Sequence, residues 1–214
     1  AKDLTKWAFE ISEKYKVYCI LRSFTRLSHA TGAVQLGELP QLKRNAAFDT
    51  TQVITPETPF IVELHKTTHE RQDGIQEDFE SCSFNRYEGP NKPELLIVCS
   101  GNGGPLSREA VELLGLEKTT GILKIATLWP FPKRLVRKYL SRAKKVLIIE
   151  ETDPFVELHV KETIADSEEL AGKIKVYGQA SGHISHWGER TPDELVSVLS
   201  KLYDKEYVPR DRNY

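Results

Sequence analysis

The sequence predicts an α/β protein in which helices cover both faces of a mostly parallel β-sheet. The first observation is a set of largely apolar runs, at residues 95–99, 121–126, 146–149 and 174–177. Strands that are apolar along their whole length are typical of parallel sheets, because both of their faces are covered. The second observation is that helical patterns separate these runs, and such alternation builds strand–helix–strand units. We therefore expect residues 93–204 to form one compact α/β domain with its own core.

The stretch before this domain is less regular. Residues 3–15 predict an amphipathic helix, because their apolar residues recur at helical spacing. The apolar run at 17–22 predicts a strand, with Cys19 in the protein interior. Residues 30–57 carry glycines and prolines with only weak alternation, and they predict an irregular connector.

A second helix is predicted to start at Thr58 and Pro59, since proline favours the first helical position. Only its first turns, at residues 60–64, are expected to be well buried, because the sequence then becomes polar. Residues 88–93 read Glu-Gly-Pro-Asn-Lys-Pro and predict a linker before the carboxy-terminal domain.

Within that domain, each predicted strand leads into a helix with its own boundary signal. The helix after the first strand ends at Gly115, and residues 135–140 predict a helix with a basic outer face. Asp153 is the predicted N-cap of a helix that begins at Pro154, and Thr191 opens the last helix.

Composition indicates an ordinary globular chain in a reducing, cytoplasmic environment. The 214 residues carry 30 Lys and Arg against 31 Asp and Glu, and this net charge of -1 argues against nucleic acid or a membrane surface as a partner. No apolar run reaches the about 18 residues of a membrane span. Cys19, Cys82 and Cys99 lie far apart, and Cys99 is expected in the core. The absence of methionine leads us to expect a piece of a longer polypeptide.

The richest cluster of polar side chains follows the first predicted strand, where residues 22–29 read R-S-F-T-R-L-S-H. Ligands of α/β proteins bind at the edge of the sheet where strands end, so this segment is the leading candidate for a binding site. Arg22 and Arg26 are candidates to pair with a substrate carboxylate or with acidic groups across a subunit boundary. The alternative is that they pair with Asp or Glu within the protein.

A glycine-rich turn, S-G-N-G-G at residues 100–104, follows the strand at 95–99. Glycines let backbone N–H groups approach an anion at a helix N-terminus. The spacing fits neither the dinucleotide-binding pattern nor the Walker pattern, which favours a tight strand-to-helix turn. Gly101, Asn102 and Gly103 stay candidates for contact with a ligand or a partner subunit.

Other titratable residues are weaker candidates. Glu150 and Glu151 are adjacent on a strand and point to opposite faces, so they are not a catalytic dyad, and one is expected to cap or pair nearby. His65 and His69 have the spacing of a zinc pair, but no third ligand is evident, which favours a solvated helix face. His183 lies in a glycine-rich turn, and the sequence offers no Ser-His-Asp order.

Several short motifs resemble one enzyme family, in the same order along the chain. Residues 22–29 are similar to the R-T-T-T-R-x-S-H stretch of the alpha (large) subunit of indolepyruvate ferredoxin oxidoreductases, with Ser23-Phe24 in place of Thr-Thr. Residues 148–157, I-I-E-E-T-D-P-F-V-E, resemble that family's v-v-E-E-x-d-P-f-i-E. The remaining matches are Gly32–Val34 with Gly37-Glu38, Phe84-Asn85, Leu123–Ala126 with Trp129–Pro132, Gly182–Ile184, and Gly188–Asp193.

The resemblance implies a domain organisation. Residues 1–40 would be the carboxy-terminal part of a thiamine-diphosphate pyrimidine-binding α/β domain, and 41–92 a connector with a helix. Residues 93–204 would be a transketolase C-terminal-like domain, and 205–214 a tail. Among the residues of the family stretch, Arg22, Thr25, Arg26, Ser28 and His29 are then expected near the substrate or the cofactor.

The resemblance also implies an activity. The chain would be an internal portion, inactive alone, of an oxidoreductase that decarboxylates indolepyruvate or another aryl 2-oxo acid to an acyl-CoA and passes electrons to ferredoxin. Thiamine diphosphate, Mg²⁺ and [4Fe-4S] clusters would be held outside these residues, so no catalytic residue and no metal ligand is assigned. The implied partners are the rest of the alpha subunit, a beta (gamma-domain-like) subunit and ferredoxin, in a cytoplasmic oligomer.

Two interpretations of other classes stay open. One is a non-catalytic module that binds a small ligand at the glycine-rich turn. The other is an assembly domain, the C-terminal module of a different thiamine enzyme.

Overall fold

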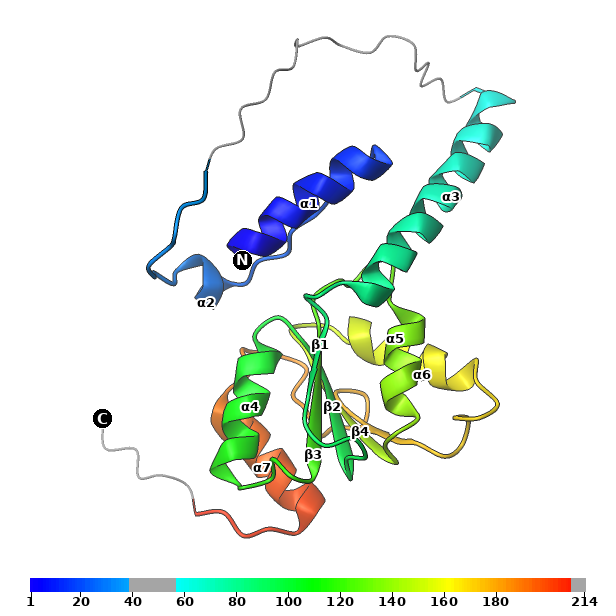
Figure 1. Cartoon of the computed structure of the whole chain (residues 1–214). Helices are drawn as coiled ribbons and strands as arrows, with labels where there is room; N and C mark the ends of the chain where they lie inside the picture. The colour runs from blue at the N-terminus through cyan, green and yellow to red at the C-terminus, as the bar shows by residue number, and fades with distance from the viewer. Residues whose placement is uncertain (39–56, 209–214) are drawn as a thin grey trace. The chain divides into compact units, whose positions relative to one another are not determined.

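A computed structural model describes residues 1–38 and 57–208. The chain divides into two compact units, Ala1–Gln72 and Asp73–Tyr214, whose helices and strands are labelled in Figure 1. Helix α3, at Phe60–Ser81, runs across the boundary between the units. In the described parts of the chain, none of the helices combines the length with the apolar character of a membrane span.

The first unit contains the predicted amphipathic helix but not the predicted strand. Helix α1 spans Lys2–Tyr15, buries Ile11 and ends at Lys16, where the backbone turns left-handed with φ 53°. The segment at 17–22 pairs with no strand in the described part of the chain. Cys19 is exposed there, so the predicted strand and the predicted burial of Cys19 are both wrong. The physical reason is that a strand needs neighbours to take its hydrogen bonds and to cover its side chains.

The two remaining helices of the first half differ from prediction in detail. Helix α2 is a single turn, Thr25–Ser28, within a segment expected to follow a strand. Helix α3 begins at Phe60, one residue after Pro59, which was the predicted first position. Its burial is opposite to the prediction, because residues 60–62 are exposed and Ile75 is the buried residue. Of the predicted connector, residues 39–56 lie outside the described residues, and residues 30–38 form no helix or strand.

The second unit is built on a five-stranded sheet in the order β1-β3-β2-β4-β5. The strands are β1 (Arg86–Glu88), β2 (Leu95–Ser100), β3 (Thr120–Ile125), β4 (Lys145–Ile149) and β5 (Lys175–Tyr177). Strands β2 to β5 are parallel to their neighbours, and β1 is antiparallel to β3, with Tyr87 opposite Leu123. The four apolar runs are therefore confirmed as strands. Strand β1 was not predicted, and it lies partly in the stretch expected to be a linker.

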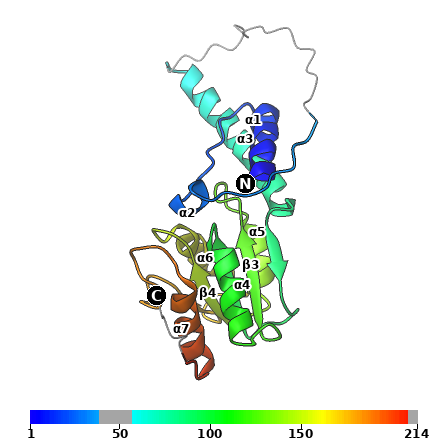
Figure 2. The same ribbon diagram turned by 90° about the vertical axis from the view of Figure 1, so that its left-hand side faces the viewer.

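Helices cover both faces of this sheet, as predicted. The helices of the second unit are α4 (Gly103–Leu113), α5 (Lys133–Leu140), α6 (Phe155–Ala165) and α7 (Pro192–Tyr203). Figures 1 and 2 show α4 and α7 together on one face, with α5 and α6 on the other. Along β2, Leu95, Ile97 and Cys99 pack towards α4 and α7, while Leu96 and Val98 pack towards α5 and α6. This explains why the strand is apolar at every position.

Helix boundaries in the second unit follow most of the predicted signals. Gly115 follows α4 with φ 61°, a conformation that glycine adopts without strain. Thr191 is the N-cap of α7, and its hydroxyl accepts the backbone N–H of Glu194 at 3.2 Å. The prediction for α6 is wrong: the N-cap is Pro154, and no side chain at that position caps the helix. The α/β architecture itself, mostly parallel and covered on both faces, is confirmed.

Candidate functional site

The segment at 22–29 brings its polar side chains to the surface of the first unit. Thr25, Arg26 and Ser28 lie on the single turn of α2, and Arg22 and His29 flank it. All five side chains are exposed. The hydroxyls of Ser23 and Ser28 lie 2.7 Å apart and hold the two ends of the turn together. The segment therefore displays cationic and hydroxyl groups on one short turn, and contact with a substrate or cofactor stays a prediction.

The glycine-rich turn at 100–104 is shaped by packing. Gly101 has φ 53°, and Asn102 caps α4 without a side-chain hydrogen bond. A Cβ on Gly103 would lie 2.8 Å from the carbonyl oxygen of Ile149, which is closer than real Cβ atoms approach backbone. Glycine is thus required for α4 to approach β4, and this favours the tight-turn interpretation. Whether Gly101, Asn102 and Gly103 also contact a ligand or partner stays a prediction.

The polar network of the second unit lies beyond the carboxyl end of β4. Glu150 is only 3% exposed, and its carboxylate accepts the backbone N–H groups of Val156 at 2.7 Å and Glu157 at 2.9 Å. Glu150 therefore caps α6 in place of Asp153, which satisfies N–H groups that a helix start leaves unpaired. Burial raises the pKa of Glu150, and the two N–H groups partly oppose that rise.

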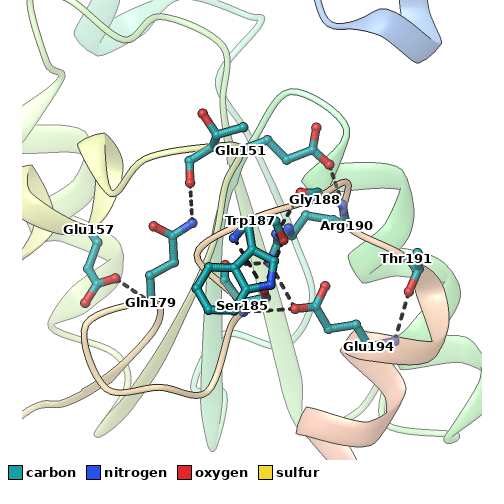
Figure 3. Close-up of polar contacts among 10 residues, drawn as sticks. Glu151, Glu157, Gln179, Ser185, Trp187, Gly188, Arg190, Thr191 and Glu194 are labelled. Atoms are coloured by element: carbon teal, nitrogen blue, oxygen red, sulfur yellow. Dashed lines mark hydrogen bonds and ion pairs between the residues drawn. The ribbon is translucent and has the colours of Figure 1, made fainter.

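A second buried carboxylate, that of Glu157, ties α6 to the loop after β5. It accepts the backbone N–H groups of Gln179 at 2.8 Å and Ala180 at 3.3 Å, and Lys161 lies 2.6 Å away. A Cβ on Gly178 would lie 2.4 Å from this carboxylate, so the glycine admits the close contact. Figure 3 shows the contact between Glu157 and Gln179. The side-chain amide of Gln179 in turn donates to the carbonyl of Thr152 at 2.6 Å.

The third part of the network is the buried guanidinium of Arg190, which is 1% exposed. It donates to the carbonyl oxygens of Ser185, Trp187 and Gly188 at 2.8–2.9 Å and to the carboxylate of Glu194 at 2.9 Å. The backbone N–H of Arg190 donates to Glu151 at 2.8 Å (Figure 3). Glu150 and Glu151 follow β4, which ends at Ile149, and do not lie on the strand, where they were expected. The expectation that one of them caps or pairs nearby is confirmed by Glu150 at the start of α6.

This network is suited to holding loops in place. The carboxylates of Glu150 and Glu157 are filled by groups of the protein itself, so neither is presented to a substrate. Sequence reasoning did not identify Glu157 or Arg190 as important. Both residues lie within matched motifs, 148–157 and 188–193, but the resemblance gave neither side chain a role.

The described residues do not fit the metal and cluster chemistry that the resemblance implies for the complete enzyme. Within residues 1–38 and 57–208, no group of three or more His, Cys, Asp and Glu side chains is arranged to hold a metal ion. Cys19, Cys82 and Cys99 are free, and in the described part of the chain none of them belongs to a group of three candidate ligands such as an iron–sulfur cluster needs. Cys99 lies buried in the core, and this burial raises its pKa to about 12. Its thiol therefore stays protonated and does not serve as a nucleophile.

Three further candidate histidines lie in two places. His65 and His69 lie exposed on α3 with their Nε2 atoms 3.1 Å apart, so the predicted common face is confirmed. His183 lies in the exposed loop after β5, where its ring contacts the hydroxyl of Ser181 at 3.0 Å. Among the described residues we find no Ser-His-Asp triad.

Comparison with known proteins assigns a class to the second unit. Residues 93–185 match the family "Pyruvate:ferredoxin oxidoreductase core domain II". This match covers β2 to β5 with α4 to α6, the part of the sheet that carries the Glu150 and Glu157 contacts.

More specific relatives extend over nearly the whole chain. Indolepyruvate oxidoreductase subunit IorA of Thermococcus kodakarensis is 38% identical over 212 residues, which is 96% of this chain and 32% of the relative. The same subunit of Archaeoglobus fulgidus is 35% identical over 189 residues, 86% of this chain and 28% of the relative. The resemblance to the indolepyruvate oxidoreductase large subunit is confirmed, and the chain spans about a third of these relatives.

Two solved structures are similar to part of this chain. The 2-oxoglutarate:ferredoxin oxidoreductase from Magnetococcus marinus is 20% identical, with a TM-score of 0.49 over 67% of this chain and 23% of that chain. A split-gene transketolase in an inactive tetramer gives a TM-score of 0.42 at 18% identity, over 56% of this chain and 42% of that chain. Similarity at these values does not bear on function.

Proposed function

We propose that this chain is an internal portion of the alpha subunit of a thiamine-diphosphate-dependent indolepyruvate ferredoxin oxidoreductase. The complete enzyme would oxidatively decarboxylate indolepyruvate, or another aryl 2-oxo acid, to an acyl-CoA with ferredoxin as electron acceptor. The observation that carries the proposal is similarity in register to the indolepyruvate oxidoreductase subunit over 96% of the chain. The match of residues 93–185 to a pyruvate:ferredoxin oxidoreductase domain supports the same class of reaction.

The proposal assigns a place to each region. Residues 1–40 belong to the preceding pyrimidine-binding domain, residues 41–92 are a connector, residues 93–204 are the transketolase C-terminal-like domain, and residues 205–214 are a tail. The exposed apolar side chains of Tyr18 and Ile20 support the first assignment, because such a segment is stabilised when it joins a sheet. The partners are the rest of the alpha subunit, a beta subunit and ferredoxin in the cytoplasm.

The cofactors of the proposed reaction bind outside the described residues. Thiamine diphosphate with Mg²⁺ would supply the carbanion chemistry, and iron–sulfur clusters would carry the electrons. The contribution of the second unit is structural: Glu150, Glu157 and Arg190 fix the loops at the carboxyl edge of the sheet. Fixed loops present a surface of constant shape to a neighbouring domain or subunit.

The turn at 22–29 is the proposed contact with the substrate. Arg22 and Arg26 would bind the carboxylate of the 2-oxo acid, since guanidinium groups recognise carboxylates through paired hydrogen bonds. Thr25, Ser28 and His29 would supply further hydrogen bonds from the same exposed turn. The three types of side chain suit an anionic, oxygen-rich ligand.

The test of the proposed activity uses the complete alpha subunit, produced with its partner subunit without oxygen. We expect reduction of ferredoxin that requires indolepyruvate, coenzyme A and thiamine diphosphate together. Phenylpyruvate, pyruvate and 2-oxoglutarate serve as matched alternative substrates. Faster turnover of pyruvate or 2-oxoglutarate than of indolepyruvate would contradict the substrate class, and activity without thiamine diphosphate would contradict the enzyme class.

The site assignment has its own test in the same complete enzyme. Arg26→Ala is expected to lower kcat/KM for indolepyruvate by about tenfold to a hundredfold, the range for a charge-assisted hydrogen bond. Arg26→Lys should recover part of the loss. Arg137→Ala is the matched control, because Arg137 is exposed on α5 and far along the chain from the turn. Unchanged kinetics for Arg26→Ala would remove Arg26 from the substrate site.

A further inference from the structure

Helix α3 carries a pair of histidines that the proposed function does not use. His65 and His69 are four residues apart on the same helix, which places them on one face in successive turns. Both side chains are exposed, and their ring centroids are 4.5 Å apart. Their Nε2 atoms approach to 3.1 Å, so the two rings point their outer nitrogens at a common position.

We propose that His65 and His69 form a binding site for a divalent transition-metal ion on α3. Imidazole nitrogens bind Zn²⁺ at about 2.0–2.1 Å. With both bonds of that length, a separation of 3.1 Å between the nitrogens gives an angle of about 100° at the metal, which suits tetrahedral or square-planar coordination. The two nitrogens are therefore already at the separation that one ion requires, and rotation of the rings about their side-chain bonds would turn both lone pairs toward it.

The chemistry of the pair defines which ions it takes. Imidazole suits Cu²⁺, Ni²⁺ and Zn²⁺, whereas Mg²⁺ and Ca²⁺ prefer oxygen ligands. The contact between the two Nε2 atoms requires one ring to carry its proton on Nε2, and that ring binds the metal once its proton is on Nδ1 instead, so that both rings stay neutral and both Nε2 lone pairs face the ion. No third His, Cys, Asp or Glu completes the set among the described residues, so water fills the remaining positions.

Binding at this position has a consequence for α3. The first turn of the helix leaves Phe60, Ile61 and Val62 exposed, so packing contributes little to its stability there. The hydroxyls of Thr67 and Thr68, between the two histidines, donate back to helix carbonyls at 2.8–2.9 Å. A metal ion that bridges two successive turns would fix the helix at its weakly packed end, because ligand binding to the folded state alone stabilises it.

The test is a titration of the metal-free chain with Cu²⁺, followed by calorimetry and by electron paramagnetic resonance. We expect one site with two nitrogen ligands, with Cu²⁺ bound more tightly than Ni²⁺ or Zn²⁺ and no binding of Mg²⁺. The second imidazole acts as an intramolecular ligand, so His65→Ala and His69→Ala should each weaken this binding by about a hundredfold. Alanine favours helix, so both variants are expected to keep α3.

The matched control is the double variant His183→Ala/His186→Ala, which removes two histidines of the loop after β5 and leaves α3 intact. It should bind Cu²⁺ as the parent chain does. A second readout is amide hydrogen exchange, in which Cu²⁺ should slow exchange across residues 60–72 of the parent chain only. The proposal is overturned if the parent chain shows no such site, if either single variant binds within about threefold of the parent chain, or if the control loses the site.

Discussion

Two apolar runs of similar composition have opposite environments in this protein. Val17–Leu21 in the first unit and Val146–Ile149 in the second both consist of apolar and β-branched residues followed by charged ones. Ile20 is 84% exposed, whereas Ile148 is 1% exposed. The difference lies in their neighbours, since β4 is paired with β2 and β5 while the first run is paired with no strand in the described part of the chain.

The comparison shows what an apolar run does and does not specify. Its composition favours an extended backbone, and burial of its apolar side chains lowers the free energy of the folded state. Burial itself depends on strands and helices that other parts of the chain supply. The polar residues after each run also depend on neighbouring segments. Glu150 and Glu151 accept backbone N–H groups from α6 and from Arg190, whereas the polar side chains of residues 22–29 are exposed.

The largest expected effect comes from truncating one isoleucine in each run. Ile148→Ala should lower the free energy of unfolding by about 4 kcal/mol, because it leaves a cavity in a packed core. Ile20→Ala should change it by less than about 0.5 kcal/mol in this chain. Urea unfolding measures both, and Ile148→Val, at about 1 kcal/mol, keeps the comparison measurable if the alanine variant does not fold. Equal costs for the two alanine variants would contradict the contrast in burial.

The next effect contrasts a buried arginine with an exposed one. Arg190→Ala should destabilise the chain by about 3 kcal/mol, since it removes the buried charge that pairs with Glu194 and the donor that binds the loop carbonyls. Arg22→Ala, at an exposed position, should cost less than about 0.5 kcal/mol. Urea unfolding again provides the measurement, and a near-neutral Arg190→Ala would show that the loop does not depend on the guanidinium.

The smallest effect sharpens the role of the carboxylate after β4. Glu150→Gln should cost about 1 kcal/mol at pH 7, because an amide oxygen replaces only one of two acceptors at the start of α6. Since burial raises the pKa of Glu150 in the folded state, the folded chain binds the proton first. The contribution of Glu150 to stability therefore rises as the pH falls through its raised pKa towards the ordinary value, and levels off below that value.

The measurement is the difference in unfolding free energy between the parent chain and Glu150→Gln between pH 7 and pH 4. Taking the difference cancels Glu88 and Glu162, whose pKa values are lowered by hydrogen bonds from Arg108 and Lys133. The difference should widen as the pH falls. A difference that narrows would show that the folded state stabilises the charged form of Glu150.

The sheet of the second unit was predictable because each of its four parallel strands carries its own signal. Residues 95–99 and 146–149 are apolar at nearly every position, and periodicity fixes the helices between them. Strand β1, at residues 86–88, has no such signal, since Arg86 and Glu88 are charged and the strand exists only by pairing with β3. The prediction that Cys19 is buried was wrong for the converse reason, because a local sequence pattern does not reveal that a neighbouring strand is missing.

The polar network was less accessible to sequence reasoning. Glu157 lies on α6 between Val156 and Leu158, and its own residue type does not distinguish it from a solvated glutamate. Its burial follows from the loop that β5 brings over it, where Gln179 presents its backbone N–H. Resemblance to a family marked residues 148–157 and 188–193 in advance, but it did not say which of their side chains bind one another.

The anchoring of the 185–190 loop has a practical consequence. The guanidinium of Arg190 donates hydrogen bonds to the carbonyls of Ser185, Trp187 and Gly188, while Trp187 is 79% exposed. An indole displayed on a clamped segment is a natural fluorophore whose emission depends on what covers it. Docking of another domain or subunit on residues 185–190 would shift the emission of Trp187 to shorter wavelength without a change in loop conformation, so this residue, one of three tryptophans in the chain, would report assembly at the loop.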